Sequence, residues 1–349
     1  MAKVAMRLGE VRQVLGDPQR KPLIRMIREA GDMARSSGKF PWRYFHSFAY
    51  RKDAGPHTEY LYGDQITSLV DRLKASDEHG LLEDKLRFEA WFRSRNFPLA
   101  RQFAHNEGRT FWVDGAERQV DDLAAFKALV EELRARSSHG SIFVKPVGGM
   151  QGDGCRRIDR ADADLAELYE DTRARPFLFQ ETLVQHPALA AIYPGSINTI
   201  RLLTCRAPGQ PPAVIAAILR LGMGRSIVDN ASQGGIAVGI DLETGRLLRL
   251  ARQFFEYGGK VCAAHPDTGF RFEGFEVPHL QMAVSVAQQA AADLSHPLIG
   301  WDLAVTGPGV VLMEGNAVPH LVLTEVALGR GLMTHPPFRQ LYQGMGLPS

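Results

Sequence analysis

The spacing of hydrophobic and polar positions divides the chain into a first part with helical periodicity and a second part with the shorter period of strands. Apolar residues recur at helical spacing over residues 9–35, with a break near Pro22, and over residues 64–76, 81–95 and 121–136. From residue 141 onward, short apolar or alternating runs predict strands over residues 141–146, 177–183, 197–206, 213–222 and 236–241, and a long helix over residues 278–294. Because few helices separate these strands, the order favours an α+β fold with largely antiparallel sheets over a doubly wound one.

Two alternating runs on either side of Gly307-Pro308-Gly309 predict a β-hairpin. If the turn is centred on Pro308, Asp302 lies directly across from Glu314, and Asn316 lies further along the same face. We expect the opposite face to join the hydrophobic core through Ile299, Trp301, Leu303, Val305, Val311 and Met313.

The acidic pair of this hairpin predicts a metal site. Two carboxylates directly opposed in a sheet repel each other unless a cation lies between them. Carboxylate and amide oxygens are hard ligands that suit Mg²⁺. Small neighbours at Gly300, Ala304 and Gly315 leave room for a ligand. The alternative is a solvated edge hairpin whose acids face water.

A second candidate site begins at Lys145, which ends an apolar strand directly before a glycine-rich loop over residues 147–154. Glycines let backbone N–H groups approach phosphate oxygens, and the lysine adds a point charge. The loop follows neither the Walker A nor the G-x-G-x-x-G pattern. An ordinary glycine-rich turn with a solvent-facing lysine is the alternative reading.

Three further segments carry polar groups at strand ends. Residues 177–183 form an apolar strand whose polar end offers backbone groups to adenine and a carboxylate to ribose. Arg201 lies within an apolar strand and needs an anionic partner if buried, either a phosphate or an acidic neighbour. The loop that begins at Asn230 and ends at Gly234-Gly235 is placed to close over a phosphoryl group.

Composition limits the partners of the chain. Its 349 residues carry 41 Lys+Arg and 39 Asp+Glu, so the net charge of +2 gives no global reason to expect nucleic acid or an anionic membrane as the main partner. Residues 1–60, however, hold 12 Lys+Arg against 6 Asp+Glu. The aromatic residues over 40–62 either pack a small helical domain or stack nucleic-acid bases, and the former is favoured.

The cysteines and the apolar runs indicate the cellular compartment of the protein. Cys155, Cys205 and Cys262 are widely spaced, which argues against a disulfide framework and a structural zinc site. No secretory signal and no apolar run of about 20 residues is visible. We therefore expect a cytoplasmic protein without a membrane span.

In chain order, these segments resemble the ATP-grasp superfamily. The S-x-N-T-x-R segment at residues 196–201 and the G-x-D and E-x-N segments at residues 300–302 and 314–316 are similar to the branch called sugar-transfer-associated ATP-grasp, related to α-L-glutamate ligase-like proteins. The resemblance spans about residues 80–335 and is most specific at the acidic pair with its asparagine.

The resemblance implies two α+β subdomains that clamp ATP, at residues 80–180 and 181–349, behind a helical, basic and aromatic N-terminal domain at residues 1–79. It implies that Asp302, Glu314 and Asn316 bind Mg²⁺. Two magnesium ions are expected, and Mn²⁺ can take their place. It further implies phosphate binding by Lys85, Lys145, Gly148, Gly149, Gly152 and Gly154, and adenine and ribose binding by Gln180, Glu181 and Leu183, with Glu181 on the ribose.

The same resemblance implies the chemistry. Arg201, Lys145 and Asn230 would act on the transferring phosphoryl group, and Gly300-Trp301 stand where many ATP-grasp ligases carry an arginine. In the expected reaction, the carboxylate of a small-molecule or peptide substrate is activated as an acyl phosphate. An amine or thiol then attacks the acyl phosphate. A kinase acting on a hydroxyl and a nucleotide-binding interaction protein are the alternatives. The candidates for a general base are His186, His265 and His320.

Overall fold

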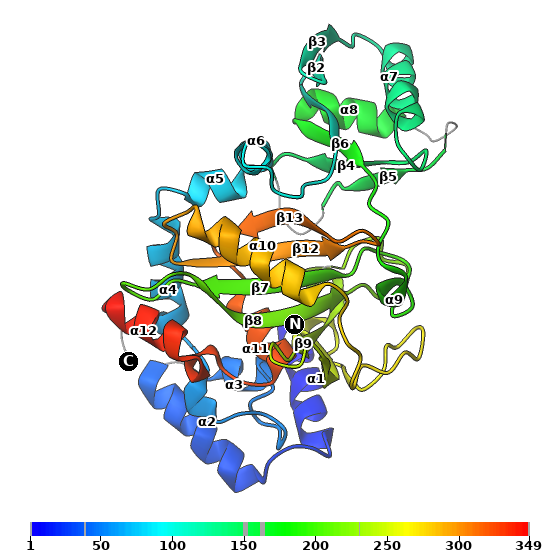
Figure 1. Ribbon diagram of the computed structural model, residues 1–349. Coiled ribbons are helices and arrows are strands. Elements are labelled where there is room, and N and C mark those ends of the chain that lie inside the picture. Colours follow the sequence, from blue (N-terminus) through cyan, green and yellow to red (C-terminus); the bar gives the residue numbers. More distant parts are fainter. Residues whose placement is uncertain (1, 38–39, 149–152, 161–164, 230, 348–349) are drawn as a thin grey trace.

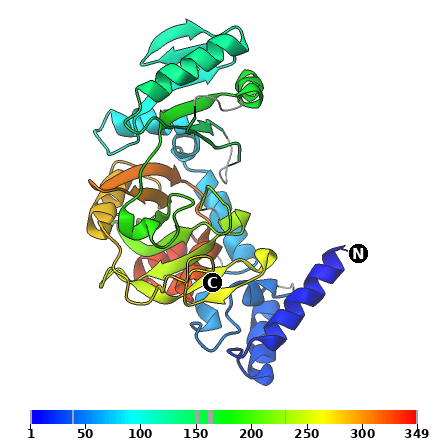
Figure 2. The ribbon, with the colours of Figure 1, turned by 90° about the vertical axis from the view of Figure 1, so that its right-hand side faces the viewer.

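The computed structural model describes residues 2–37, 40–148, 153–160, 165–229 and 231–347, and of residues 2–8, 36–37 and 232 the backbone only. Three parts follow one another along an elongated molecule (Figure 1). A small subdomain with its own sheet lies above a larger sheet, and the N-terminal helices lie below it. In Figure 2 the first helix projects at the end of the molecule far from the small subdomain. No helix among the described residues is long and apolar enough to cross a bilayer.

The N-terminal part is helical, as predicted. Its elements are α1 (Ala2–Gly16), α2 (Leu23–Ser37), α3 (Trp42–His46), the 3₁₀ turn η1 (His57–Glu59) and α4 (Asp64–Lys74). Glu29 of α2 is buried, and its carboxylate accepts hydrogen bonds from Lys21 Nζ at 2.8 Å and the Tyr44 hydroxyl at 2.7 Å. Burial alone would raise the pKa of Glu29, but these bonds and the bond from Arg25 lower it to about 2. The buried ion pair of Arg43 with Glu325 ties this part to the larger sheet's helices.

Two short helices link the N-terminal part to the small subdomain. They are α5 (His79–Glu83) and α6 (Lys85–Arg93). The prediction of one helix over residues 81–95 was wrong, because Asp84 adopts an extended backbone conformation and caps α6 with its carboxylate, which accepts from the N–H groups of Leu86 and Arg87. Helix α6 packs on the larger sheet, where the rings of Phe92 and Trp301 meet edge to face with centroids 5.7 Å apart.

The small subdomain is a sheet covered by two helices. Its elements are β1 (Gln102–Glu107), β2 (Thr110–Val113), β3 (Ala116–Gln119), α7 (Leu123–Ala135), β4 (Ile142–Pro146), β5 (Arg156–Ile158), α8 (Ala166–Ala174) and β6 (Phe177–Glu181). The strand order is β3-β2-β1-β6-β4-β5, and all neighbours are antiparallel. One face of the sheet packs under α7 and α8 through residues such as Val144, Phe177 and Phe179. The other face of β4 and β6 therefore carries Phe143, Lys145 and Gln180.

The larger subdomain has a second antiparallel sheet, in the order β11-β10-β9-β8-β7-β12-β13. Its elements are α9 (Pro187–Ala190), β7 (Thr199–Cys205), β8 (Ala213–Leu221), η2 (Ala231–Gln233), β9 (Ile236–Ile240), β10 (Leu247–Gln253), η3 (Phe255–Tyr257), β11 (Val261–Cys262), α10 (Leu280–Ala292), β12 (Leu298–Val305), β13 (Val310–Asn316), α11 (Leu321–Leu328), η4 (Leu332–Thr334) and α12 (Pro336–Gly344). The predicted α+β class with antiparallel sheets is confirmed.

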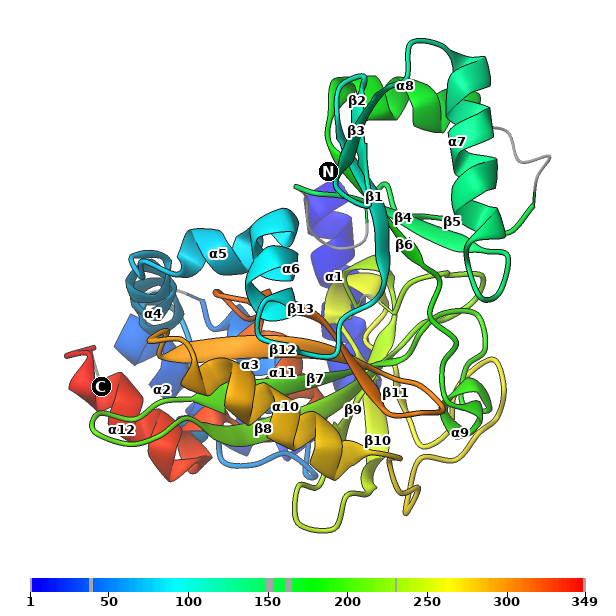
Figure 3. The same cartoon turned by 45° about the horizontal axis from the view of Figure 1, so that its top comes forward.

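Helices cover both faces of the larger sheet (Figure 3). The face under α10 is apolar and includes Ile200, Leu202 and Trp301. The face under α11 and α12 includes Leu203 and Ile218. Because side chains alternate along a strand, Arg201, Arg220 and Asp302 share this second face. The polar residues therefore lie on the α11 side of the sheet.

Candidate functional site

The base of the β12–β13 hairpin has the predicted register. Asp302 pairs with Glu314, and Gly300 pairs with Asn316, whose side-chain nitrogen donates to the Gly300 carbonyl at 3.2 Å. Because that amide nitrogen is used, the Asn316 oxygen is the atom left to bind a ligand. Glu314 and Asn316 line the same cavity as Asp302. The two acids and the asparagine thus lie together.

A β-bulge separates this base from the tip of the hairpin. The register shifts after Asp302, so that Leu303 pairs with Leu312 rather than Met313. Leu312 is buried in the core, whereas Met313 lines the cavities on the polar side. The prediction that Val311 and Met313 join the core was therefore wrong, because the extra residue reverses the alternation.

Asp302 is bound by two arginines. Arg201, its partner on β7, donates to it through Nε and through Nη2, the latter at 2.7 Å. Arg220 on β8 donates from Nη1 at 2.7 Å to Asp302 and from Nη2 at 3.1 Å to Asp229. Asp229 also accepts from the Thr199 backbone N–H at 2.9 Å. The anionic partner that a buried Arg201 needs is thus the acidic neighbour Asp302.

Burial and charge act in opposite directions in this network. Burial alone would raise the pKa of Asp302, but Arg201 and Arg220 outweigh it, and the pKa of Asp302 is lowered. Burial would likewise lower the pKa of Arg220, yet Asp229 and Asp302 raise it overall. Asp302 is therefore ionised, and Arg220 keeps its positive charge.

Gly300 makes room for the Arg201 side chain. A Cβ atom at residue 300 would lie 2.8 Å from the Pro319 Cβ and 3.3 Å from the Arg201 Cδ. The space at residue 300 is thus bordered by an arginine from the neighbouring strand. Arg220 adds a second guanidinium that sequence reasoning missed. Arg220 could have been found by the same pattern as Arg201, because both are arginines within an apolar strand.

Lys145 extends from the small sheet into the same region. Its Nζ atom lies 3.9 Å from Glu89 Oε1, and Gln180 Nε2 donates to the same oxygen at 2.6 Å. Burial lowers the pKa of Lys145, although Glu89 and Glu314 act against the shift. Lys85 donates to the Val147 carbonyl at 3.4 Å and lines the cavity beside Lys145. Glu89 was also missed by the sequence reasoning, because it lies in an ordinary amphipathic helix.

The glycine loop is described in part. Gly148 lines the cavity that contains Lys145. Gly154 has a φ of +73°, and a Cβ atom there would lie 2.6 Å from the Arg175 Nη2. Gly149 and Gly152, together with Asn230, lie outside the described residues.

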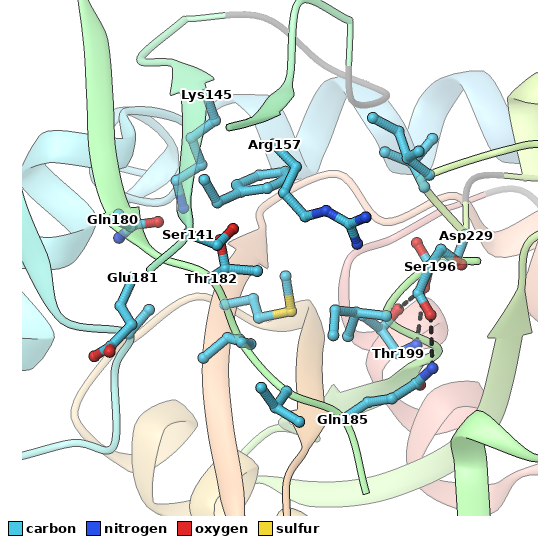
Figure 4. A pocket seen from close by; sticks show the side chains of 18 of the residues that line it. Ser141, Lys145, Arg157, Gln180, Glu181, Thr182, Gln185, Ser196, Thr199 and Asp229 are labelled. Carbon is cyan, nitrogen blue, oxygen red and sulfur yellow. Dashed lines mark hydrogen bonds between the residues drawn. The ribbon is translucent and has the colours of Figure 1, made fainter. Parts of the chain in front are cut away.

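Two adjoining cavities occupy the space between the sheets. One, of about 400 Å³, has a largely apolar lining that includes Phe143, Leu183, Ile197, Leu312 and Met313. The other, of about 290 Å³, is lined by the basic residues Lys85, Lys145, Arg201 and Arg220 and by the acidic residues Glu83, Asp153, Asp229, Asp302 and Glu314. Both cavities are lined by Lys145 and Asp229. Figure 4 shows Lys145 and Arg157 reaching in from the small subdomain, opposite Thr199 and Asp229.

Glu181 points away from the centre of this space. Its Oε1 accepts a hydrogen bond from the Ser138 backbone N–H at 2.7 Å, and Figure 4 shows the side chain directed outward. Gln180, on the opposite face of β6, lies beside Glu89 and faces the cavity. Leu183 and Thr182 follow at the strand end and line the apolar cavity.

The three histidines considered as bases differ in position. His320 lines the charged cavity and caps α11, where its Nδ1 accepts from the Leu323 N–H at 3.3 Å. His265 is buried against the Gly222 carbonyl, and His186 caps α9. His320 alone of the three borders the site.

The donor set suits a metal that shares ligands with a phosphate. Among the described residues, no group of three or more His, Cys, Asp or Glu side chains could hold a metal ion by itself. Glu314 and Asn316 offer two oxygens, whereas the oxygens of Asp302 already accept from arginines. Mg²⁺ commonly takes one or two carboxylates and completes its shell with water and substrate phosphates. The residues therefore fit a magnesium ion held jointly with a bound phosphate.

Comparison with known families identifies the chain. Residues 65–336 match the family of sugar-transfer associated ATP-grasp proteins. The chain belongs to this family. Its ATP-grasp resemblance, drawn from the residues, is thereby confirmed, and the N-terminal helices α1 to α3 precede the matched region.

The matching solved structures include a synthetase, an ATP-grasp ligase and a synthase, all of low sequence identity. D-alanyl-alanine synthetase A from Vibrio cholerae O1 biovar eltor is 12% identical, over 76% of this chain and 65% of that one, with a TM-score of 0.47. The ATP-grasp ligase PsnB, complexed with minimal precursor, Mg and ADP, is 15% identical over 77% and 60%, with a TM-score of 0.43. Carboxyaminoimidazole ribonucleotide synthase from Aspergillus clavatus, complexed with ATP, is 13% identical over 77% and 52%, with a TM-score of 0.42.

The chain thus spans between 52% and 65% of the length of these structures. A search of curated proteins returned no match.

Proposed function

We propose that the protein is an ATP- and Mg²⁺-dependent ligase that activates a substrate carboxylate as an acyl phosphate for attack by an amine or thiol, with release of ADP and phosphate. The observation that carries the proposal is the pair of adjoining cavities, one apolar and one charged, between the two sheets of an ATP-grasp protein. An apolar space next to a cavity with four basic side chains, Lys85, Lys145, Arg201 and Arg220, matches a base joined to a triphosphate.

Different residues would bind the base and the phosphates of the nucleotide. Phe143, Leu183 and Met313 would enclose the adenine ring in the apolar cavity. Lys145, where the two cavities meet, and Lys85, in the charged cavity, would bind phosphate oxygens. Glu181 remains the proposed ribose contact only if its side chain leaves Ser138 and turns inward.

Glu314 and Asn316 would hold magnesium, with Asp302 joining them if an arginine releases one of its oxygens. Bound there, the ion would neutralise phosphate oxygens. The chain itself would supply the two guanidiniums of Arg201 and Arg220. The buried Nε of Arg220 has no hydrogen-bond partner in the described part of the chain, and an anionic oxygen would satisfy such a donor.

In the proposed reaction, a substrate carboxylate oxygen attacks the γ-phosphorus of ATP, and the bond from that phosphorus to the bridging oxygen breaks to leave ADP. The amine or thiol then attacks the acyl carbon, phosphate leaves with the bonding electrons, and the nucleophile loses its proton. Lys145, Arg201 and Arg220 would disperse charge on the transferring group, which is the main task of a protein in phosphoryl transfer. His320 lines the cavity where the second attack would occur.

The missing arginine at residues 300 and 301 made a kinase a credible alternative. Arg201 and Arg220 now stand beside that place, so the positive charge that an acyl phosphate requires is present. The nucleotide-binding interaction protein is the remaining alternative, in which ATP binds without turnover.

A screen for ADP release separates these functions. The purified chain is incubated with Mg-ATP and a matrix of small carboxylates and carboxylate-containing peptides against amines and thiols. The ligase function predicts ADP release that needs both partners, together with transfer of ¹⁸O from the labelled carboxylate to phosphate. Phosphate retained on the product would instead establish a kinase. Binding of Mg-ATP without ADP release across the matrix would favour the interaction protein.

Lys145→Met provides the matched control for contaminating ATPase activity. The substitution removes the ammonium group but keeps much of the side chain's volume. Its circular dichroism spectrum and urea midpoint are compared with those of the parent chain. ADP release that persists unchanged in this variant would not come from the proposed site.

A further inference from the structure

Exposed apolar side chains gather in the N-terminal helices. Ten large hydrophobic residues are exposed in the described part of the chain, and six of them lie between residues 11 and 40. These six are Val11, Leu15, Leu23, Ile24, Ile27 and Phe40. Scattered exposed hydrophobic residues are ordinary, but a contiguous group marks a binding surface. This group lies outside the matched ATP-grasp region, which begins at residue 65.

Four of these residues, with Phe40, line a groove between α1 and α2. The groove has a volume of about 450 Å³ and is also lined by Pro41, Trp42 and Phe45. Glu10 is the one charged residue among its lining residues. On α2, Leu23, Ile27 and Ala34 form its wall, spaced four and seven residues apart on one side of the helix. The groove is therefore an apolar channel along two helices.

The inward sides of the same helices are already packed. Met33 is buried in the N-terminal core, Glu29 is fixed by Lys21 and Tyr44, and the buried Val14 and Met26 form the floor of the groove. The groove is thus a second, outward surface of a helix pair that is held in place from behind. A surface of this kind suits a third helix that packs against both.

Positive charge flanks the groove. Arg12 follows the groove residue Val11, and Arg28 follows Ile27, each about 100° further around its helix. Both arginines are exposed, and neither has an ion pair with any side chain that the structure describes. A partner with acidic residues beside its apolar stripe would complement these charges.

We propose that this groove binds an amphipathic helix of a partner protein, with an apolar stripe at the positions i, i+3/i+4 and i+7 flanked by acidic residues. A second copy of the chain fits less well, because a two-fold contact would bring identical basic rims together. A bilayer fits less well, because a flat surface does not fill a channel between two helices. The proposal is independent of the ligase chemistry.

The test uses a synthetic helical peptide of about 18 residues with leucine at the heptad positions a and d and glutamate at e and g. A control peptide carries lysine in place of glutamate. Binding to the full chain is measured by calorimetry and by the fluorescence of Trp42, which lines the groove. We expect saturable binding of the acidic peptide and at least tenfold weaker binding of the basic one.

Two matched variants locate the contact. Ile27→Glu places a charge inside the groove and should weaken binding of the acidic peptide by at least about tenfold. Ile24→Glu, at a residue that is 86% exposed and does not line the groove, should change it by less than about threefold. Because both side chains are largely exposed, both variants should keep the parent's urea midpoint. Arg28→Glu should reverse the preference between the two peptides.

Three results would overturn the proposal. The first is no saturable binding of either peptide, or equal binding of both. The second is binding to anionic phosphatidylglycerol vesicles that Ile24→Glu and Ile27→Glu weaken equally, because a bilayer would contact both residues. The third is a dimer of the parent chain in light scattering that Ile27→Glu dissociates, because the groove would then be occupied by a second copy.

Discussion

Replacing Asp302 by asparagine removes the negative charge that two buried arginines share. Asp302 is 5% exposed, and its two oxygens accept three hydrogen bonds from Arg201 and Arg220. Loss of one partner from a buried ion pair costs about 3–5 kcal/mol, because the remaining charge stays buried and unpaired. Arg220 keeps Asp229, so we expect Asp302→Asn to lower the free energy of unfolding by about 3 kcal/mol, the lower end of that range.

Glu314→Gln is the matched comparison, because Glu314 lies directly across the hairpin. Glu314 is half-buried, and no hydrogen bond to its side chain is found among the described residues. Its neutralisation relieves repulsion by Asp302, so the free energy of unfolding should change by less than about 1 kcal/mol. Magnesium dependence of ATP binding should nevertheless be lost.

Urea unfolding followed by tryptophan fluorescence measures both stabilities, and calorimetric titration of ATP with and without Mg²⁺ measures the metal dependence. An Asp302→Asn variant as stable as its parent would refute the structural role of the arginine network. A Glu314→Gln variant that keeps its full magnesium dependence would remove Glu314 from the metal site.

Three further changes test other parts of the molecule. Lys145→Met should weaken ATP binding by at least about tenfold in calorimetry, since a charge-assisted hydrogen bond contributes about 1.5–3 kcal/mol, and unchanged affinity would exclude Lys145 from the phosphate site. Gly331→Ala should lower the free energy of unfolding by more than about 2 kcal/mol, measured in urea, because the new Cβ atom would lie 1.9 Å from the Glu59 carbonyl oxygen. The control is Gly9→Ala, whose Cβ atom would have nothing within 4 Å, and it should be neutral or stabilising. The pKa of Glu29 is lowered to about 2, so its ionised form contributes about 3 kcal/mol to the free energy of unfolding. This contribution is present above a pH of about 4.5 and is lost as the pH falls toward 2. Glu29→Gln should abolish this part of the acid sensitivity. Equal acid sensitivity of the two proteins would contradict that assignment.

The hairpin was the part of the site most accessible to sequence reasoning. Strand alternation and the Gly-Pro-Gly turn together placed Asp302 opposite Glu314, and the structure has that pairing. The bulge at Met313 was not predictable, because an extra residue in one strand leaves no mark on the period of the other. The α+β class and most strand positions could also be predicted, because strands and helices differ in the period of their apolar residues.

Long-range partners were out of reach. The sequence indicated that Arg201 needs an anion, but two anions were possible, and only the pairing of β7 with β12 selects Asp302. Glu89 lies 91 positions from Gln180, and no local pattern joins them. The break at Asp84 was missed because apolar spacing continues across it, while the capping bonds that stop one helix and start the next depend on backbone geometry.

The bulge on β13 gives the hairpin two separate registers. Toward the turn, Val305 pairs with Val310, while at the base Asp302 keeps its pairing with Glu314. The exposed tip at Gly307 and Pro308 lies beyond both registers, so a residue gained or lost there need not rotate the acids off the polar face. Related chains are thus expected to vary freely in turn length while the spacing of Glu314 and Asn316 stays fixed, so the tip of this hairpin is a suitable place to insert a reporter sequence.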